Sequence, residues 1–541
     1  MFTKLALNHS AHCFFNSYFR DHQTAYDQAE KCFKIKLPEA TLTVPVIAYS
    51  KLGVHQFKNA FNLTVPKGSR TIGFLEAAEL ICRETDSKLY ERLNSSIQTM
   101  ALSLRLRQKE IQNLYSGNIT FLDSEQNLHV GHNFHPTPKS RDEFSQDDLI
   151  KYGPEFGASF KLKWFLVKND LIWQDQSHHF KKMDLYKKEV PQGYTAMPVH
   201  PWQKEVLLRD PVIKAYIRQN SIIEGGETPD QWFATSSMRS LYSPTCPYMI
   251  KFSMSVRMTN SIRHMQETEV KRGMLLHDVL MTTEGKNFSE RFPNFHIMHE
   301  PMVMGIKDPE GNVLPQTIIL LRENKLTPQD KASVLATLTQ ENPFQGKNLI
   351  GICLSENTSG TKWFEAFMQK VVAPLLVAQA DYGIMLGAHQ QNLIVHLKDG
   401  VPSGATFRDC QGTGYSNLGE SKFLPELDDK EKFLANVVPQ EASMKLFTYY
   451  LIVNSVMNTM AALGRASGDP EQLYIEQFQA FLTHLQNRVK DPFVIQHLLN
   501  SKDLHQKGNF RCSAKNLNEN TTDNPLEIYN SFPNPFYRSA Q

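Results

Sequence analysis

Two nearby segments in the C-terminal third carry residues suited to hold a metal-bound nucleotide. Residues 387–395 read GAHQQNLIV and residues 407–410 read FRDC, so Asn392 and Asp409 fall on neighbouring elements. Hard cations such as Mg²⁺ prefer oxygen ligands, and protein kinases hold Mg²⁺ against ATP with an Asn and an Asp. We predict that Asn392 and Asp409 bind ATP and Mg²⁺. His389, taken alone, is as consistent with a packed core histidine.

A second unit runs from residue 248 to residue 265 and alternates apolar with polar side chains, which predicts a strand over residues 248–258. Thr259 or Asn260 then caps a predicted helix, on which Thr259 and Arg263, four residues apart, share a face. Eight extended residues span about 26 Å, so Lys251 and Thr259 cannot contact one small ligand unless the strand bends. We predict Lys251 beside a nucleotide and the Thr259/Arg263 pair beside an organic acid. The alternative is a surface strand with solvated charges.

The basic loop at residues 131–141, GHNFHPTPKSR, combines two histidines, a lysine and an arginine with two prolines. Prolines restrict a loop, which suits a segment that holds donors toward phosphate groups. By itself the pattern also fits an exposed basic loop.

A short Ser/Thr-rich segment, ATSSMRS at residues 234–240, places Arg239 among hydroxyl groups. A guanidinium group can bind a carboxylate or a phosphate in bidentate fashion. An ordinary Ser/Thr-rich loop is the alternative.

The elements that must position these residues fall into three parts. Residues 1–127 are predicted to be mostly helical, residues 128–345 to mix sheet and helix, and residues 346–541 to be mostly helical around the site residues. Residues 161–167 and 171–174 are predicted to form a strand pair, and residues 195–199 and 392–396 two further strands. The whole is an α+β, multidomain fold.

Composition limits the functional classes. The 541 residues include 58 basic and 56 acidic ones, a net charge of +2 that argues against a nucleic-acid partner. The seven cysteines are scattered and none forms a C-x-x-C pair, which favours reduced thiols in a reducing compartment. No apolar run reaches the roughly 20 residues that a membrane helix needs. We therefore expect a soluble, cytoplasmic protein without a membrane partner.

Taken in order, these motifs resemble the aerobactin-synthetase family, the siderophore synthetases that work without a non-ribosomal peptide synthetase. The resemblance covers nearly the whole chain after about residue 70. Its segments are residues 131–141, 152–156, 200–203, 236–239, 251–263, 387–392 and 408–409.

The resemblance implies a cupped hand of thumb, fingers and palm, with a kinase-like Asn/Asp nucleotide site in the palm and a homodimeric assembly. It also implies transfer of AMP from ATP to a carboxylate, usually of citrate, followed by attack of an amine or hydroxyl. The acid pocket would contain Ser237, Arg239, Thr259, Arg263 and His389. The nucleotide contacts would be His135, Lys139, Arg141, Lys251, Asn392 and Asp409, together with Ser237 and Arg239. Arg263, His389 and Lys251 would be the catalytic groups, and Arg322 a further candidate on the nucleotide side.

Two positions depart from the family pattern, which usually has Glu at Gly387 and Pro at Asn133. The missing carboxylate puts the Mg²⁺ geometry in question. Two other functions stay open: a kinase-like phosphotransferase, for which no convincing Gly-rich phosphate loop is present, and a non-catalytic citrate- or nucleotide-binding relative. The identity of the acid and of the nucleophile is not determined by these residues.

Overall fold

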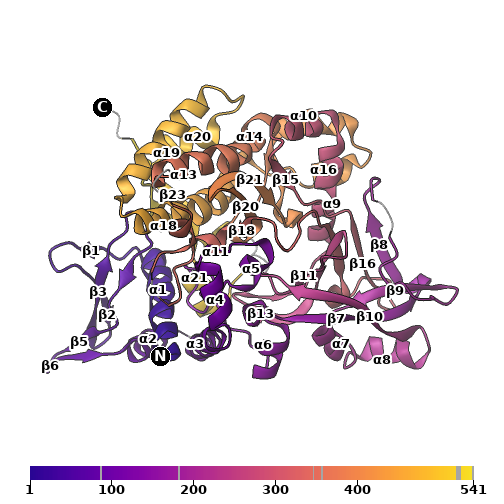
Figure 1. The fold of residues 1–541 in the computed structure, drawn as a ribbon, viewed down its shortest axis with the longest axis horizontal. Helices are drawn as coiled ribbons and strands as arrows, with labels where there is room; N and C mark the ends of the chain where they lie inside the picture. The colour runs from indigo at the N-terminus through magenta and orange to yellow at the C-terminus, as the bar shows by residue number, and fades with distance from the viewer. Residues whose placement is uncertain (86–87, 181–182, 345, 355–357, 519–524, 539–541) are drawn as a thin grey trace.

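The computed structural model describes residues 1–85, 88–180, 183–344, 346–354, 358–518 and 525–538. Its helices and strands form three parts that follow the chain order (Figure 1). The N-terminal part lies at one side, a large sheet at the other, and the C-terminal helices above both. Each part has its own main cluster of buried apolar side chains.

The N-terminal part packs a long helix, α1 (Phe2–His22), against a six-stranded sheet. The strands are β1 (Tyr26–Asp27), β2 (Cys32–Leu37), β3 (Ala40–Ala48), β4 (Gln56–Phe57), β5 (Phe61–Val65) and β6 (Gly68–Ile72). The helices that follow are α2 (Phe74–Cys82), α3 (Leu89–Leu106), α4 (Gln108–Tyr115) and α5 (Phe121–Gln126). The core of this part also takes in a residue from the far end of the chain, Phe510, whose ring lies 5.3 Å from that of Phe14.

The sheet in the N-terminal part corrects the expectation of a mostly helical segment at residues 1–127. Strands β2 and β3 alternate buried and more exposed side chains, the period-2 pattern of a sheet with one covered face. Helical spacing elsewhere in the segment dominated the prediction. The helices of the segment are α1 before the sheet and α2 to α5 after it.

The middle part is built on an eight-stranded sheet in the order β8-β16-β17-β12-β11-β10-β7-β9, in which all neighbours are antiparallel. Its strands are β7 (Ser159–Lys168), β8 (Ile172–Gln176), β9 (Tyr194–Val199), β10 (Ile222–Ala234), β11 (Ser240–Tyr242), β12 (Tyr248–Phe252), β16 (Met302–Ile306) and β17 (Ile319–Glu323). A separate hairpin joins β13 (Met254–Met258) to β14 (Ser261–Arg263), and the helices are α6 (Gln146–Tyr152), α7 (Pro201–Leu207), α8 (Pro211–Arg218), α9 (Glu267–Met281) and α10 (Thr283–Arg291).

The predicted pairing of residues 161–167 with residues 171–174 is wrong. Strands β7 and β8 belong to one sheet, but β8 pairs with β16 at one edge and β7 pairs with β9 and β10 near the other. The intervening Asn169–Leu171 forms a short 3₁₀ turn rather than a hairpin. The prediction paired these strands only because they are close in sequence. Their actual partners, β16 for β8 and β9 and β10 for β7, are set by the register of the whole sheet.

The C-terminal part surrounds a four-stranded sheet with helices. The sheet runs β15-β21-β20-β18, with β15 (Phe295–Ile297), β18 (Ala332–Val334), β20 (Leu393–Lys398) and β21 (Val401–Phe407). Its helical elements include α11 (Leu335–Thr339), α12 (Leu349–Cys353), α13 (Gly360–Phe367), α14 (Ala373–Tyr382), α15 (Asn417–Phe423), α16 (Lys430–Leu434), α17 (Gln440–Phe447), the π-helical turn η8 (Thr448–Val456), α18 (Met457–Ser467), α19 (Glu471–Gln486), α20 (Phe493–Asn500) and α21 (Asn509–Lys515). The hairpin β23 (Asp503–Lys507) and β24 (Tyr529–Pro533) returns the chain to the N-terminal part.

One helical stretch among the described residues, Gln440–Ser467, has the length and hydropathy of a membrane span. Of its most apolar window, 89% is buried inside the protein. The stretch therefore behaves as a core helix. The mixture of helices and sheets agrees with the predicted fold class.

Candidate active site

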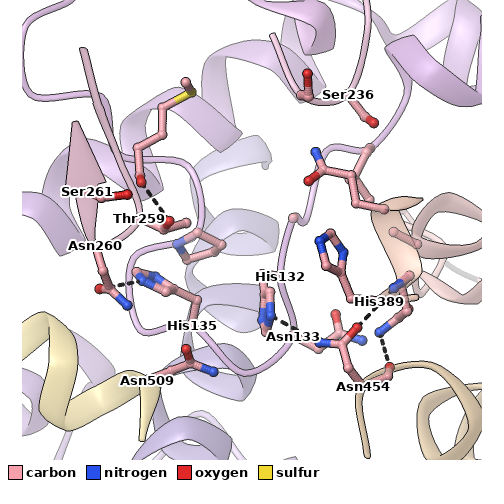
Figure 2. A pocket seen from close by; sticks show the side chains of 18 of the residues that line it. His132, Asn133, His135, Ser236, Thr259, Asn260, Ser261, His389, Asn454 and Asn509 are labelled. Atoms are coloured by element: carbon pink, nitrogen blue, oxygen red, sulfur yellow. Dashed lines mark hydrogen bonds between the residues drawn. The ribbon is translucent and has the colours of Figure 1, made fainter. Parts of the chain in front are cut away.

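A cavity of about 350 Å³ opens where the three parts meet. Its walls come from the loop at residues 131–141, the turn after β10 and the β13–β14 hairpin. The C-terminal part contributes the segment before β20, Asp409, and residues of η8 and β23. Figure 2 shows His132, His135 and His389 around the same space, with Thr259 and Asn260 on one side and Asn454 on another. The volume lies within the range of small-molecule sites.

Most of the predicted site residues line this cavity, although they come from five separate segments. They are His135, Lys139, Arg141, Ser237, Arg239, Thr259, Arg263, His389 and Asp409. Two predicted residues, Lys251 and Asn392, stand behind the wall. Lys251 contacts Asp409, and the Asn392 side-chain amide donates to the carbonyl of Gly387 at 3.1 Å.

The segment after Met258 is a hairpin, which corrects the predicted helix at residues 259–265. Thr259 lies in the turn with a φ of +57°, and β14 returns antiparallel to β13. The expected neighbours still meet, because the Arg263 Nη2 donates to the Thr259 hydroxyl at 2.6 Å and to the Met258 carbonyl at 2.9 Å. Two side chains four residues apart come together across a tight hairpin turn as they do on one face of a helix. The spacing alone therefore did not distinguish a hairpin from a helix.

The predicted strand over residues 248–258 is interrupted at Ser253, between β12 and β13. This break falls between Lys251 and Thr259 in the sequence. Arg239 donates to the carbonyl of Arg263 at 3.1 Å, which joins the turn after β10 to the hairpin. In the same turn the Ser237 hydroxyl accepts a hydrogen bond from the backbone of Ser240.

Lys251 and Asp409 form the ion pair at the base of the cavity. The Lys251 Nζ lies 2.5 Å from the Asp409 Oδ1 and 2.8 Å from the Gln411 Oε1. Burial lowers the pKa of Lys251 to about 8, although Asp409 opposes the change. Burial acts to raise the pKa of Asp409, but Lys251, Arg322 and Arg239 outweigh it and hold that pKa well below its usual value. Asp409 is therefore a carboxylate at every physiological pH.

Asp409 also occupies an unusual backbone conformation, with a φ of +72°. Non-glycine residues in this region are uncommon and cluster at functional sites. Behind it, Arg322 contacts the buried Glu300 at 2.6 Å and Asp409 at 3.5 Å. Arg322 is thus a second buried cation beside Asp409.

The basic loop at residues 131–141 is buried, contrary to the alternative of an exposed loop. Lys139 and Arg141 are 5% and 8% exposed, and both contact the carboxylate of Glu155, at 3.8 and 3.2 Å. Burial lowers the pKa of Lys139 to about 8, against the opposing effect of Glu155. Burial acts to raise the pKa of Glu155, but the two cations keep it low. The loop presents its polar groups to the cavity from a fixed framework.

The histidines of the cavity are neutral at physiological pH. Burial lowers the pKa of His389 and of His135 to about 4, and that of His132 to about 3. His135 is also fixed by Asn260, whose side-chain oxygen lies 3.0 Å from its Nε2. His389 therefore contributes a neutral ring, so the cationic charge of the predicted acid pocket comes from its two arginines.

Comparisons with known proteins agree with this geometry. The model of the IucA/IucC family matches residues 120–340, and the model described as ferric iron reductase FhuF-like transporter matches residues 361–522. The N(2)-citryl-N(6)-acetyl-N(6)-hydroxylysine synthase of Vibrio mimicus is 34% identical, over 97% of this chain and 95% of that protein. The chain belongs to the IucA/IucC family. The Escherichia coli protein of the same description is 30% identical over 98% of both chains.

Among solved structures, the ATP-bound aerobactin synthetase IucA from a hypervirulent pathotype of Klebsiella pneumoniae has a TM-score of 0.90. It is 30% identical and covers 98% of this chain and 100% of its own. The resemblance to siderophore synthetases predicted from the motifs is confirmed at the level of the IucA/IucC family.

Several cavity residues of this IucA/IucC-family chain were not predicted from the sequence. Tyr449, Asn454, Lys507 and Asn509 reach the cavity from η8 and from the C-terminal hairpin region. Asn454 contacts His132 at 3.3 Å and accepts a hydrogen bond from the backbone of Gln390 at 3.0 Å. Tyr449 and Asn454 lie in a mostly apolar stretch, and Lys507 and Asn509 in a short polar one, so no local pattern distinguishes them.

The donor set fits Mg²⁺ only together with a nucleotide. No group of three metal-binding side chains occurs among the residues that the structure describes. Asp409 offers a carboxylate that is 30% exposed at the cavity, and Asn392 stands one layer behind it. Mg²⁺ usually takes one or two protein oxygens and completes its shell with phosphate oxygens and water. Gly387 leaves room for a Cβ at the position where the family usually has Glu, because an added Cβ would meet its nearest neighbour, the Gly412 carbonyl oxygen, at 3.6 Å.

Proposed function

We propose that this chain is an ATP-dependent siderophore synthetase that activates citrate as an acyl-adenylate and joins it to an amine or hydroxyl. The observation that carries the proposal is a single cavity lined by Arg239, Arg263 and Asp409, with Lys251 paired to Asp409 behind the wall. Two cationic groups suit a polycarboxylate, and the carboxylate with its lysine suits a metal-bound triphosphate. The relatives' descriptions as citryl-hydroxylysine synthases support citrate as the acid.

In the acid subsite, Arg239 and Arg263 bind citrate carboxylates through charge-assisted hydrogen bonds. The hydroxyls of Ser237 and Thr259 orient the acid, and the neutral ring of His389 contacts it without adding charge. Arg263 holds Thr259 in place, so the two act as a unit.

In the nucleotide subsite, His135, Lys139 and Arg141 line the side toward the phosphates, with Ser237 and Arg239 at the boundary between the two subsites. Asp409, with Asn392 one layer behind it, would hold Mg²⁺, which would supply charge neutralisation of the phosphate oxygens. Lys251, paired with Asp409, would add positive charge on the phosphate side and stabilise the transition state.

The reaction has two steps. A citrate carboxylate oxygen attacks the α-phosphorus of ATP, and pyrophosphate leaves. The nitrogen or oxygen of the second substrate then attacks the acyl carbon, loses its proton, and AMP leaves with the bonding electron pair. Lys251, Arg263 and His389 hold the reacting groups in line, so positioning and electrostatics supply the catalysis.

The proposal extends to the architecture. Residues 1–127, 128–345 and 346–541 form thumb, fingers and palm around the cavity, with the Asn/Asp nucleotide site in the palm. We further propose a cytoplasmic homodimer. Three main clusters of buried apolar side chains support a division into three parts, although the cluster of the C-terminal part also takes in residues 275–297 and 335–338.

The decisive experiment measures pyrophosphate release with ATP, Mg²⁺ and citrate, with and without hydroxylamine as a surrogate nucleophile. Citrate-dependent pyrophosphate and a citryl hydroxamate are expected. ADP instead of pyrophosphate would make the protein a phosphotransferase. Binding of citrate and ATP without any product would make it a non-catalytic relative.

A further inference from the structure

A buried ion pair lies immediately behind the cavity, between Glu125 on the short helix α5 and Arg408. The two side chains are 0% and 2% exposed. Both terminal nitrogens of Arg408 donate to the carboxylate, one to each oxygen. This is the bidentate arrangement, which fixes orientation as well as distance.

The same two side chains hold three segments of the cavity wall. The backbone N–H of Ser236 donates to the Glu125 Oε2 at 2.9 Å. The Arg408 Nη2 donates to the Ser236 hydroxyl at 3.1 Å and to the Gln391 carbonyl at 2.9 Å. Each contact lies one residue away from a predicted ligand group: Ser237, Asn392 and Asp409.

Helix α5 is itself fixed on both sides, so Glu125 is a rigid reference point. The side chain of Gln126 donates to the carbonyls of Ala158 and Ala234, at 3.0 and 3.2 Å, in the middle part. The hydroxyl of Thr337, on α11, donates to the carbonyl of Ser124 at 2.7 Å. Figure 1 shows α5 between the large sheet and the C-terminal helices.

Stability alone does not account for this pair. Apolar residues of similar volume are usually as stabilising as a buried ion pair, whereas a charged pair imposes a definite geometry. Here the ion pair fixes the position of the turn at Ser236, next to the proposed acid ligand Ser237, relative to the segment at Gln391, next to Asn392.

We infer that Glu125 is a positioning residue that acts through Arg408 and Ser236 to couple acid binding to nucleotide binding. The inference rests on the proposed function, since it assigns the two ligands to these two segments. Without the ion pair, the segments at Ser236 and at Gln391 can move independently. Binding of the nucleotide then no longer raises the affinity for the acid.

The test compares citrate affinity with and without a non-hydrolysable ATP analogue, by calorimetry. The ratio of the two affinities measures the coupling, and it is the same whichever ligand is bound first. Three proteins are compared with the wild type: Glu125→Gln, the double variant Glu125→Leu/Arg408→Met, and Asp381→Asn. Asp381 is the control, because its buried carboxylate also contacts an arginine, the partly exposed Arg291 at 2.6 Å, away from the cavity residues.

In the wild type we expect coupling of about 10-fold, within the usual range for linked sites. Glu125→Gln leaves Arg408 charged and without its carboxylate, so this variant is destabilised. The double variant removes both charges and is expected to regain the wild-type melting temperature, yet its coupling falls to within about twofold of unity. Asp381→Asn is expected to lower the melting temperature and to retain the coupling.

Wild-type coupling in a well-folded double variant would overturn the inference, as would its loss in Asp381→Asn. Pyrophosphate release by the wild type is measured alongside. If the wild type releases none with citrate, the proposed function fails. If the wild type does release pyrophosphate with citrate and the double variant shows wild-type coupling, only the positioning role fails.

Discussion

Replacing Arg263 by alanine is expected to impair use of the acid far more than use of ATP. The Arg263 Nη2 donates to Met258 and Thr259, which orients the guanidinium in the hairpin at the cavity wall. The substitution removes a charged donor for the acid and also releases the Thr259 hydroxyl. Neither of these two hydrogen bonds involves a residue that we assign to the nucleotide.

The magnitude follows from the bonds lost. A hydrogen bond to a charged group contributes about 1.5–3 kcal/mol, and about 1.4 kcal/mol corresponds to a tenfold change in affinity. Loss of one such bond to citrate therefore raises its KM on the order of 10- to 100-fold. Loss of the orientation of Thr259 adds to this value. The KM for ATP is expected to stay within about threefold of the wild type, since the change spares the nucleotide contacts.

The assay is pyrophosphate release at varied citrate and at varied ATP. Arg257→Ala is the matched control, because Arg257 lies on the same hairpin, donates to the Asn260 carbonyl at 3.1 Å and does not line the cavity. It is expected to leave both KM values unchanged. Equal losses toward citrate and ATP in Arg263→Ala, or a citrate defect of the same size in Arg257→Ala, would refute the assignment.

Four other outcomes are expected. Lys251→Met should reduce pyrophosphate release with every acid tested, because Lys251 serves the nucleotide; a defect confined to one acid would count against this role. Burial lowers the pKa of Lys251 and of Lys139 to about 8, so both are protonated below that pH and lose their charge above it. The KM for ATP should therefore rise from pH 7.5 to 9, and a flat profile would contradict the assignment of these lysines to phosphate. Gly387→Ala should shift the melting temperature by less than about 2 °C, because the added Cβ has ordinary contacts; a larger loss would show that the site cannot accept a side chain. Chelation of Mg²⁺ should stop pyrophosphate release without changing the melting temperature of the ligand-free protein, whereas a shift would reveal a resident metal.

The sequence grouped residues that meet in one cavity, but it was less successful with the elements that carry them. Nine predicted side chains from five segments, among them Arg239 and Asp409, meet in one cavity. They could be grouped in advance because their types and order along the chain resemble those of the family. The family resemblance, rather than periodicity, placed them together. The contact between Thr259 and Arg263 was predicted on a helix and occurs in a hairpin.

The parts that were not predicted depend on long-range packing. The N-terminal sheet has an alternating pattern in β2 and β3, but helical spacing over the rest of the segment outweighed it in the prediction. Strands β7 and β8 are separated by a few residues yet lie in different places in the sheet, since register over the whole sheet decides their partners. Cavity residues such as Asn454 and Lys507 carry no local signal, because their role arises only from the path of the chain around them.

The packing of Phe510 against α1 has a consequence for synthesis of the protein. The rings of Phe14 and Tyr18 lie 5.3 and 5.0 Å from that of Phe510, and the same core extends through residue 111. Roughly 400 residues separate the two contributions, which at about 5–20 residues per second corresponds to a delay on the order of 20–80 s on the ribosome. For that time the first core exposes an incomplete aromatic surface on α1, a binding site of the kind that chaperones recognise. The nascent chain completes its first core only as its last helix emerges.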